Sequence, residues 1–150
     1  MNEVSDLTAH TGYWLRMVSN AVSQEFARKV AAEGVTVAEW TFLRALYDAE
    51  AMTPSALADR MGMSRGAISK LADRLVDKTL ISRDGHANDR RMQTLSLTAA
   101  GRDKVPALAA LADRNDAEYF GVLGDEERAA LGRLLRTLAD RRGLKTVPVD

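Results

Sequence analysis

The chain contains no cysteine among its 150 residues. It can therefore form no disulfide, no thiolate metal site and no thiol-based sensor of peroxide. This absence is typical of proteins in a reducing compartment, and we expect a cytoplasmic protein. Residues 1–7 show no basic segment followed by an apolar one, so no secretory signal is expected. No apolar run approaches the roughly 20 residues of a membrane-spanning helix, so we expect no membrane partner.

Histidine is also scarce. The two histidines, His10 and His86, lie far apart in the sequence, and no carboxylate-rich motif joins them, so no metal site is expected. The chain has no glycine-rich phosphate loop, no nucleophile elbow and no histidine–carboxylate spacing on one element. The acidic run over residues 125–127 is explained by the preference for acids in the first turn of a helix. The sequence therefore predicts neither an enzyme nor a cofactor-binding protein.

Charge is balanced overall but unevenly distributed. Apolar residues make up 46% of the chain, enough for a packed core, and the 21 basic and 21 acidic residues cancel. A net charge of zero argues against a general polyanion binder. Residues 64–91, however, carry seven basic and four acidic residues, and 7 − 4 gives a local charge of +3. A local basic patch is what phosphate contact requires, although a mixed-charge helix face is often only solvated.

Long helices are expected at both ends of the chain. Apolar residues recur with helical spacing from residue 6 to residue 33. The short helices that follow cannot cover a stripe of this length, so part of it is expected to meet another subunit. Further helices are predicted from residue 99 to about 120 and after Gly124, the second with leucines at 131, 134, 135 and 138 on one face. Residues 144–150 are expected to form a loose tail.

Three shorter helices are predicted between these ends. Thr36 and Glu39 have the spacing of a capping box, which begins a helix that ends near residue 49. Thr53, followed by proline, begins a short helix that ends at Gly62. Ser64 caps a helix over residues 65 to about 78. Short strands at 80–83 and 93–97, on either side of a turn-rich segment, then predict a β-hairpin.

The short helix, glycine turn and second capped helix have the order of a helix-turn-helix. In that motif the second helix lies in the major groove of DNA, and its first turns face the bases. Because Ile68, Leu71 and Leu75 must face the core, helical spacing sets the outward residues. Arg65 is expected to pair with guanine and Ser69 to reach a base or a phosphate. The residues expected to contact DNA from this helix are Ser64, Arg65, Gly66, Ala67, Ser69, Lys70 and Arg74.

The tip of the predicted hairpin carries Arg90 and Arg91. An arginine at such a tip can enter the narrow minor groove, where the negative potential is enhanced. The neighbouring Asp89 reduces the net attraction, so its expected role is to hold an arginine side chain in a fixed pose. The alternative is that both arginines are solvated turn charges.

A candidate ligand pocket involves aromatic residues near the first two helices. His10 and Trp14 are four residues apart and would share a helical face. With Trp40 they would line a pocket between the dimerisation helices and the DNA-binding lobe. The alternative for Trp14 is packing in the core or at a dimer interface.

The chain resembles the multiple-antibiotic-resistance regulator (MarR) family of bacterial winged-helix repressors. The resemblance is carried by Asp89-Arg90-Arg91 and the following Leu95-Ser96-Leu97-Thr98 and Gly101, which are similar to the family's wing signature. The segments Leu57-Ala58-Asp59-Arg60-Met61, Ser64 and Ser69-Lys70-Leu71 match its helix-turn-helix pattern. The resemblance implies a homodimer built from the first and last helices, a palindromic operator in double-stranded DNA and, often, release by a small aromatic or phenolic effector. Because the chain has no cysteine, the cysteine-based oxidation sensing of one branch of the family is excluded.

We therefore expect a mainly α-helical protein: a winged helix-turn-helix with a two-stranded β-hairpin wing and long N- and C-terminal dimerisation helices. The expected domain spans residues 1–150, with residues 1–35 and 99–150 for dimerisation and residues 36–98 as the DNA-binding lobe. The expected function is that of a sequence-specific DNA-binding transcription regulator that represses as a homodimer.

Two other functions remain open at this point. A winged helix can be a protein-interaction module whose basic face meets an acidic protein, and sequence-selective binding of a duplex at sub-micromolar concentration would reject that reading. The chain can also be a small-molecule-binding protein or enzyme with an incidental helix-turn-helix. Turnover of a ligand that survives substitution of Arg65 and Arg91 would support this second reading.

Overall fold

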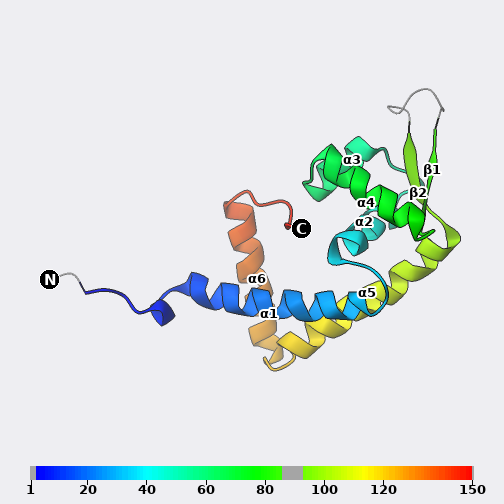
Figure 1. Cartoon of the computed structure of the whole chain (residues 1–150). Helices are drawn as coiled ribbons and strands as arrows, with labels where there is room; N and C mark the ends of the chain where they lie inside the picture. The colour runs from blue at the N-terminus through cyan, green and yellow to red at the C-terminus, as the bar shows by residue number, and fades with distance from the viewer. Residues whose placement is uncertain (1–2, 86–92, 150) are drawn as a thin grey trace.

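The computed structural model describes residues 3–85 and 93–149. Figure 1 shows α1 and α5 lying along one another, with α2, α3, α4, β1 and β2 gathered beside one end of the pair. We call these five elements the winged-helix lobe. The mainly helical fold with a two-stranded wing is confirmed. In chain order the elements are η1 (Leu7–Ala9), α1 (Thr11–Ala31), α2 (Val37–Tyr47), α3 (Pro54–Met61), α4 (Arg65–Asp77), β1 (Ile81–Asp84), β2 (Thr94–Leu97), α5 (Ala99–Phe120) and α6 (Asp125–Arg141).

Side-chain caps begin four of these helices, and those at Thr36, Thr53 and Ser64 are the caps predicted from the sequence. The hydroxyl of Thr36 accepts from the Glu39 amide at 3.1 Å, and the Glu39 carboxylate accepts from the Thr36 amide at 2.8 Å. The hydroxyls of Thr53, Ser64 and Thr98 each accept from an amide three residues on, at 3.1 Å. Each bond satisfies a backbone donor that a helix start leaves free. Local sequence alone therefore fixes where α2, α3, α4 and α5 begin.

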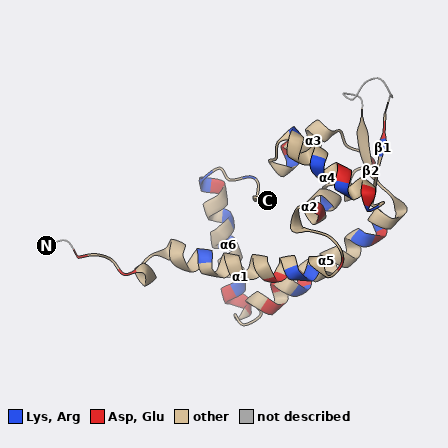
Figure 2. Cartoon of the chain, in the orientation of Figure 1, with Lys and Arg blue, Asp and Glu red and all other residues tan. Residues whose placement is uncertain are grey.

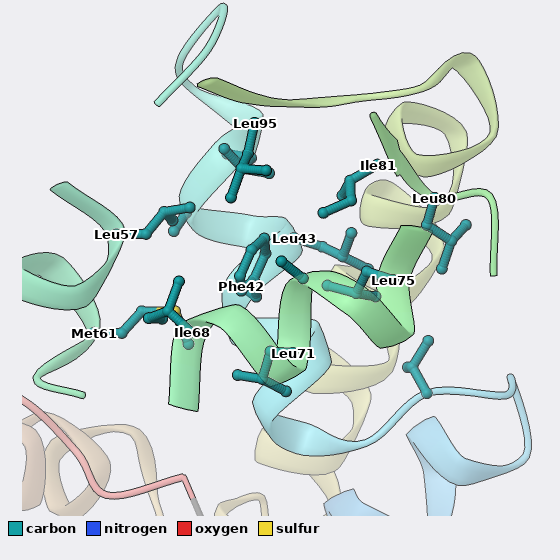
Figure 3. Close-up of a cluster of buried hydrophobic side chains, with 14 of the residues drawn as sticks. Phe42, Leu43, Leu57, Met61, Ile68, Leu71, Leu75, Leu80, Ile81 and Leu95 are labelled. Atoms are coloured by element: carbon teal, nitrogen blue, oxygen red, sulfur yellow. The ribbon is translucent and has the colours of Figure 1, made fainter. Parts of the chain in front are cut away.

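One apolar core holds the winged-helix lobe together (Figure 3). Every element of the lobe contributes buried side chains to it. They include Phe42 and Leu43 from α2, Leu57 and Met61 from α3, Ile68, Leu71 and Leu75 from α4, Ile81 from β1 and Leu95 from β2. Burying one such side chain contributes about 1.5–3 kcal/mol relative to leaving it exposed. The orientation of α4 in the lobe is therefore set by packing against both α2 and the wing.

The base of the wing is fastened to the loop between α2 and α3. Strands β1 and β2 pair antiparallel, with Ile81 opposite Leu97. Met52 and Leu95 form a further antiparallel bridge, with backbone N···O distances of 2.9 and 2.8 Å. Because Leu95 is also 1% exposed, the start of β2 is held by both backbone hydrogen bonds and core packing. The base of the wing is therefore held in a fixed position beside α4.

Polar side chains fasten α1 to α5. Asn115 on α5 is 3% exposed; its amide nitrogen donates to the Val22 carbonyl at 3.1 Å, and its oxygen accepts from the Lys29 ammonium at 2.9 Å. Lys29 also lies 2.9 Å from a carboxylate oxygen of Glu118. Both polar atoms of the buried amide are thus satisfied, as buried polar groups require. The network fixes how α1 and α5 sit against each other.

The first helix begins later than the predicted start at residue 6. The chain first makes the single turn η1, passes through His10 in an extended conformation and enters α1 at Thr11. The Trp14 indole nitrogen donates to the Thr8 carbonyl at 2.9 Å. The Thr8 carbonyl thus has a side-chain partner and needs no helical hydrogen bond. Such local side-chain bonds to the backbone compete with helix formation. A single helix from residue 6 is therefore wrong.

The C-terminal residues also differ from the loose tail predicted for them. After Gly143, which has a φ of 67°, the chain returns to the winged-helix lobe, and Val149 packs against its core. The Thr146 side chain lies so close to Gly62 that a Cβ at position 62 would be 2.6 Å from its hydroxyl oxygen. Residues 144–149 therefore connect the end of α6 to the turn between α3 and α4.

Two apolar stripes remain exposed in the single chain. On α6, Leu134, Leu135 and Leu138 are 56%, 41% and 52% exposed. On α1, Trp14 and Val18 are 48% and 46% exposed. Within residues 3–85 and 93–149, no helix is both long and apolar enough to cross a membrane. The stripes lie on the helices expected to meet a second subunit.

Candidate nucleic-acid interface

Helix α4 is presented by a tight turn at its start. Gly62 ends α3 in the left-handed conformation with a φ of 65°, which favours glycine, and the Met63 amide donates back to the Ala58 carbonyl at 3.0 Å. Ser64 then caps α4. The turn is therefore that of the predicted helix-turn-helix, and α4 takes the place of its recognition helix.

The structure places the predicted contact residues of α4 on one solvent-facing side. Ile68 and Leu75 are fully buried and Leu71 is 2% exposed, so the opposite face of the helix points outward. Ala67 is half-buried, and the other six predicted residues, Ser64, Arg65, Gly66, Ser69, Lys70 and Arg74, are exposed. These seven residues define what we call the recognition surface.

The recognition surface carries positive charge that the described protein residues do not neutralise. Arg65, Lys70 and Arg74 make no ion pair within residues 3–85 and 93–149. A Cβ added at Gly66 would have only the Ser64 hydroxyl within 4 Å, at 3.9 Å. The first turn of α4 thus carries a positive charge and, at Gly66, no side chain that would keep a duplex at a distance. Both properties suit close approach to a duplex, because phosphates attract the charge and small residues leave room for base edges.

Sequence reasoning missed an ion pair that joins α4 to the wing. Arg83 on β1 forms an ion pair and hydrogen bond with Asp73 on α4. In the sequence both residues count only toward the mixed charge of residues 64–91. The carboxylate fixes a basic side chain between the recognition surface and the wing. Only the ten-residue separation of two opposite charges hints at the pair in the sequence.

The predicted wing-tip residues fall outside the described part of the chain. Arg90, Arg91 and Asp89 lie between residues 85 and 93, where the description stops and resumes. Their minor-groove and orienting roles stay predictions. What the structure shows is the base of the wing, beside α4 (Figure 1).

The three residues of the candidate ligand pocket do not come together in one chain. His10 is the extended residue before α1 and does not share a helical face with Trp14. Trp14 packs edge-on against Tyr13, with ring centroids 5.5 Å apart. Trp40 instead packs edge-on against Phe26, at 6.5 Å. Since Phe26 is twelve residues beyond Trp14 on α1, about 18 Å along the axis separates the two sites.

A buried carboxylate lies at the C-terminal end of α4, away from the first turn of that helix. The Glu39 side chain on α2 is fully buried, and the Lys78 ammonium at the end of α4 lies 3.0 and 2.9 Å from its two oxygens. Burial raises the pKa of the Glu39 carboxyl, but hydrogen bonds from Lys78 and Thr36 and the charge of Lys78 lower this pKa by more. The carboxyl is therefore held ionised by its partners, with its pKa below the ordinary value.

Glu39→Gln is expected to make folding stability less sensitive to acid. Because the folded pKa of Glu39 is depressed, its ionisation stabilises the fold above the unfolded pKa of about 4.3, and this contribution is lost as pH falls through the folded value. Glutamine retains the capping box. Denaturant unfolding from about pH 7 to about pH 3 should show a steeper loss of unfolding free energy in the wild type. Equal slopes in the two proteins would contradict the assignment.

The described residues hold no group of three or more histidines, cysteines and carboxylates arranged for a metal ion. Acidic residues gather at the junction of α5 and α6, with basic residues among them (Figure 2). This junction contains Asp116, Glu118 and the run over residues 125–127. Acids also lie within the winged-helix lobe, among them Glu39, Asp73 and Asp77, so the charge of +3 over residues 64–91 is a local excess and not a separation of charge across the molecule.

Comparison with known proteins agrees with this geometry. Residues 33–92, which include α2, α3, α4 and β1, match the model of the MarR family. The protein assigned to transcriptional regulation of the hcr operon in Thauera aromatica is 32% identical over 133 residues, covering 88% of this chain and 80% of that protein. The transcriptional repressor MdtR of Bacillus subtilis is 29% identical over 139 residues, covering 93% and 90%.

A solved structure extends the comparison to a complex. A variant of MarR from Escherichia coli, bound to operator DNA, matches this fold with a TM-score of 0.73 and 25% identity, over 85% of this chain and 91% of that one. The match includes long stretches outside the helix-turn-helix, because the lobe alone would not reach that coverage. By sequence, over nearly its whole length, and by fold, the chain belongs to the MarR family.

Proposed function

We propose that this protein regulates transcription by binding, as a symmetric dimer, to a two-fold symmetric operator in double-stranded DNA. The observation that carries the proposal is the recognition surface. Arg65, Lys70 and Arg74 are exposed on α4 without an ion pair in the described part of the chain, beside a rigidly based wing. Relatives named as transcription regulators and a structural neighbour bound to operator DNA support it. The proposal includes no catalytic step.

The mechanism is repression by occupancy of the operator. Two recognition helices would enter successive major grooves on one side of the duplex, about 34 Å apart. Arg65 at the start of α4 would read a guanine, while Lys70 and Arg74 would bind backbone phosphates. Phosphate contacts release counterions, so affinity should fall steeply as salt rises.

The proposal assigns different tasks to the parts of the chain. Residues 36–98 would contact the operator, and residues 1–35 and 99–150 would join two subunits. The exposed stripes on α1 and α6 support this division, since apolar helix faces of this kind mark association sites. The dimer would then set the distance between the two recognition surfaces.

Release by a small aromatic or phenolic ligand is part of the proposal. It is supported by the edge-on pair of Phe26 and Trp40, which lies where α1 meets the winged-helix lobe. A ligand that binds there and favours another angle between α1 and the lobe would lower operator affinity. Trp14, near the start of α1, and His10, just before it, lie too far from Phe26 to line such a site within the same chain.

Arg65→Ala and Arg74→Ala are expected to weaken operator binding in different ways. Loss of a base contact at Arg65 should relax discrimination at one base position by about 1–3 kcal/mol. Loss of a phosphate contact at Arg74 should weaken binding uniformly across sequences and reduce the salt slope by about one. Fluorescence anisotropy with single-base operator variants at several salt concentrations would measure both quantities.

The same measurement can reject the proposal. If the wild-type protein binds random DNA as tightly as a duplex selected by the protein from a random pool, the chain would instead be an interaction module with an acidic partner. An equal loss on all sequences for Arg65→Ala would make Arg65 a phosphate contact instead of a base reader.

A further inference from the structure

Lys78 continues the basic row of α4 but is occupied by the protein itself. Lys70, Arg74 and Lys78 follow at four-residue spacing, so the sequence alone would add Lys78 to the phosphate contacts. Its ammonium instead donates to the Gly34 carbonyl at 2.8 Å and lies 2.9 and 3.0 Å from the two oxygens of Glu39. Gly34 closes the turn after α1, and Glu39 is in the first turn of α2. One side chain therefore ties the end of α4 to the corner between α1 and α2.

The buried carboxylate of Glu39 depends on Lys78 for its counter-charge. Glu39 is fully buried, and Lys78 is the cation within ion-pair distance of it in the described chain. A buried carboxylate that loses its cation is left with an uncompensated charge. Two hydrogen bonds hold the Lys78 ammonium at this corner, to the Gly34 carbonyl and to one oxygen of Glu39, which leaves it poorly placed to bind a phosphate. The Lys78 side chain is 39% exposed, but its ammonium is held by a fully buried carboxylate, so the ion pair is part of the structure of the lobe.

The two residues after Lys78 are held from the opposite side by the start of α5. The Thr98 hydroxyl donates to the Thr79 carbonyl at 2.7 Å, and the Thr98 amide donates to the Leu80 carbonyl at 3.1 Å. Thr79 has a φ of 60°, a conformation that is costly for a β-branched residue and persists only where its surroundings enforce it. Residues 78–80 are therefore clamped between the helices expected to dimerise, α1 and α5.

We call the contacts of residues 78–80 with Gly34, Glu39 and Thr98 the clamp. It holds the C-terminal end of α4, far from the first turn of that helix. Helix α4 has 13 residues and is about 20 Å long, and its first turn carries the recognition surface. A tilt of about 10° at the Lys78 end would move the Arg65 end by about 3 Å, close to the 3.4 Å rise of one base pair. Small changes at the clamp would thus change the distance between the two recognition surfaces of a dimer.

We propose that Lys78 is a positioning residue that sets the half-site spacing the dimer accepts, by bonding the end of α4 to Glu39 and Gly34. The proposal rests on the proposed function, because it presupposes a two-fold symmetric operator. In this proposal Lys78 does not contact DNA.

The test compares two duplexes: the one that the wild-type protein enriches from random DNA, and the same duplex with one base pair inserted between its half-sites. The ratio of the two affinities measures spacing selectivity. Lys78→Met is expected to reduce this ratio about tenfold, within the usual range of coupling between sites, and to leave the salt slope unchanged. Lys78→Arg, which keeps a charged donor, is expected to restore the ratio. Lys70→Met is the matched control, and it should weaken binding to both duplexes equally and lower the salt slope by about one.

Glu39→Gln provides a second variant, which keeps the capping box and therefore tests the clamp if Lys78→Met does not fold. It is expected to lose spacing selectivity in the same way. If both variants keep the wild-type ratio, or if Lys78→Met lowers the salt slope as Lys70→Met does, Lys78 is no positioning residue. If the wild-type protein enriches no symmetric duplex at all, the proposed function fails first, which distinguishes the two failures.

Discussion

Leu138→Asp is expected to separate the subunits and lower operator affinity by at least about 100-fold, because a single subunit loses the gain of a second linked half-site. The leucine is 52% exposed and is the last of the leucine stripe on α6. A carboxylate buried there without a cation would cost more than the apolar contact contributes. Sedimentation at working concentration and anisotropy with the operator duplex would measure the two effects.

Val147→Asp is the control for this variant. Val147 is 75% exposed in the segment after α6 and lies outside the leucine stripe, so the same change in charge should leave the dimer intact. A Leu138→Asp protein that remains dimeric and binds the operator with wild-type affinity would show that α6 is no part of the interface.

Gly101→Ala is expected to lower the unfolding free energy by about 2–4 kcal/mol, the range of a severe steric substitution. A Cβ at this position would lie 2.0 Å from the Leu80 carbonyl oxygen, and that oxygen belongs to backbone that already accepts from the Thr98 amide. Neither side can move without pulling α5 from the junction of α4 and β1. Denaturant unfolding at one fixed protein concentration would measure the loss, since dimer stability depends on concentration.

Gly66→Ala gives the comparison that isolates the steric effect. Position 66 is helical like position 101, but an added Cβ there meets only the Ser64 hydroxyl, at 3.9 Å. Alanine in a helix is about 0.5–1 kcal/mol more favourable than glycine, so stability should stay equal or rise. Gly101→Ala as stable as Gly66→Ala would contradict the close approach of α5 to Leu80.

Features that depend on neighbouring residues could be predicted from the sequence. Thr36, Ser64 and Thr98 each bond to an amide three residues away, so the starts of their helices follow from local patterns. Gly62 ends α3 for the same local reason. The outward set on α4 follows from its buried stripe, because helical periodicity leaves one side of the helix for solvent.

Features that depend on distant residues could not be predicted. Lys78 meets Glu39 across 39 positions, and no periodic pattern announces such a pair. The contact of Thr146 with Gly62 spans most of the chain, and the tail sequence has no regular pattern that predicts where it docks. The shared helical face predicted for His10 and Trp14 was wrong for a different, local reason: the Trp14 indole bonds to the Thr8 carbonyl, and the chain leaves the helical pattern before Thr11.

Selection of bound duplexes from random DNA tests the central claim most directly, when it is followed by counting the subunits on the enriched duplex. We expect a two-fold symmetric motif whose half-sites lie about one helical turn apart, with two chains on each duplex. A pool no different from random, or a lone subunit on an asymmetric site, would contradict that claim.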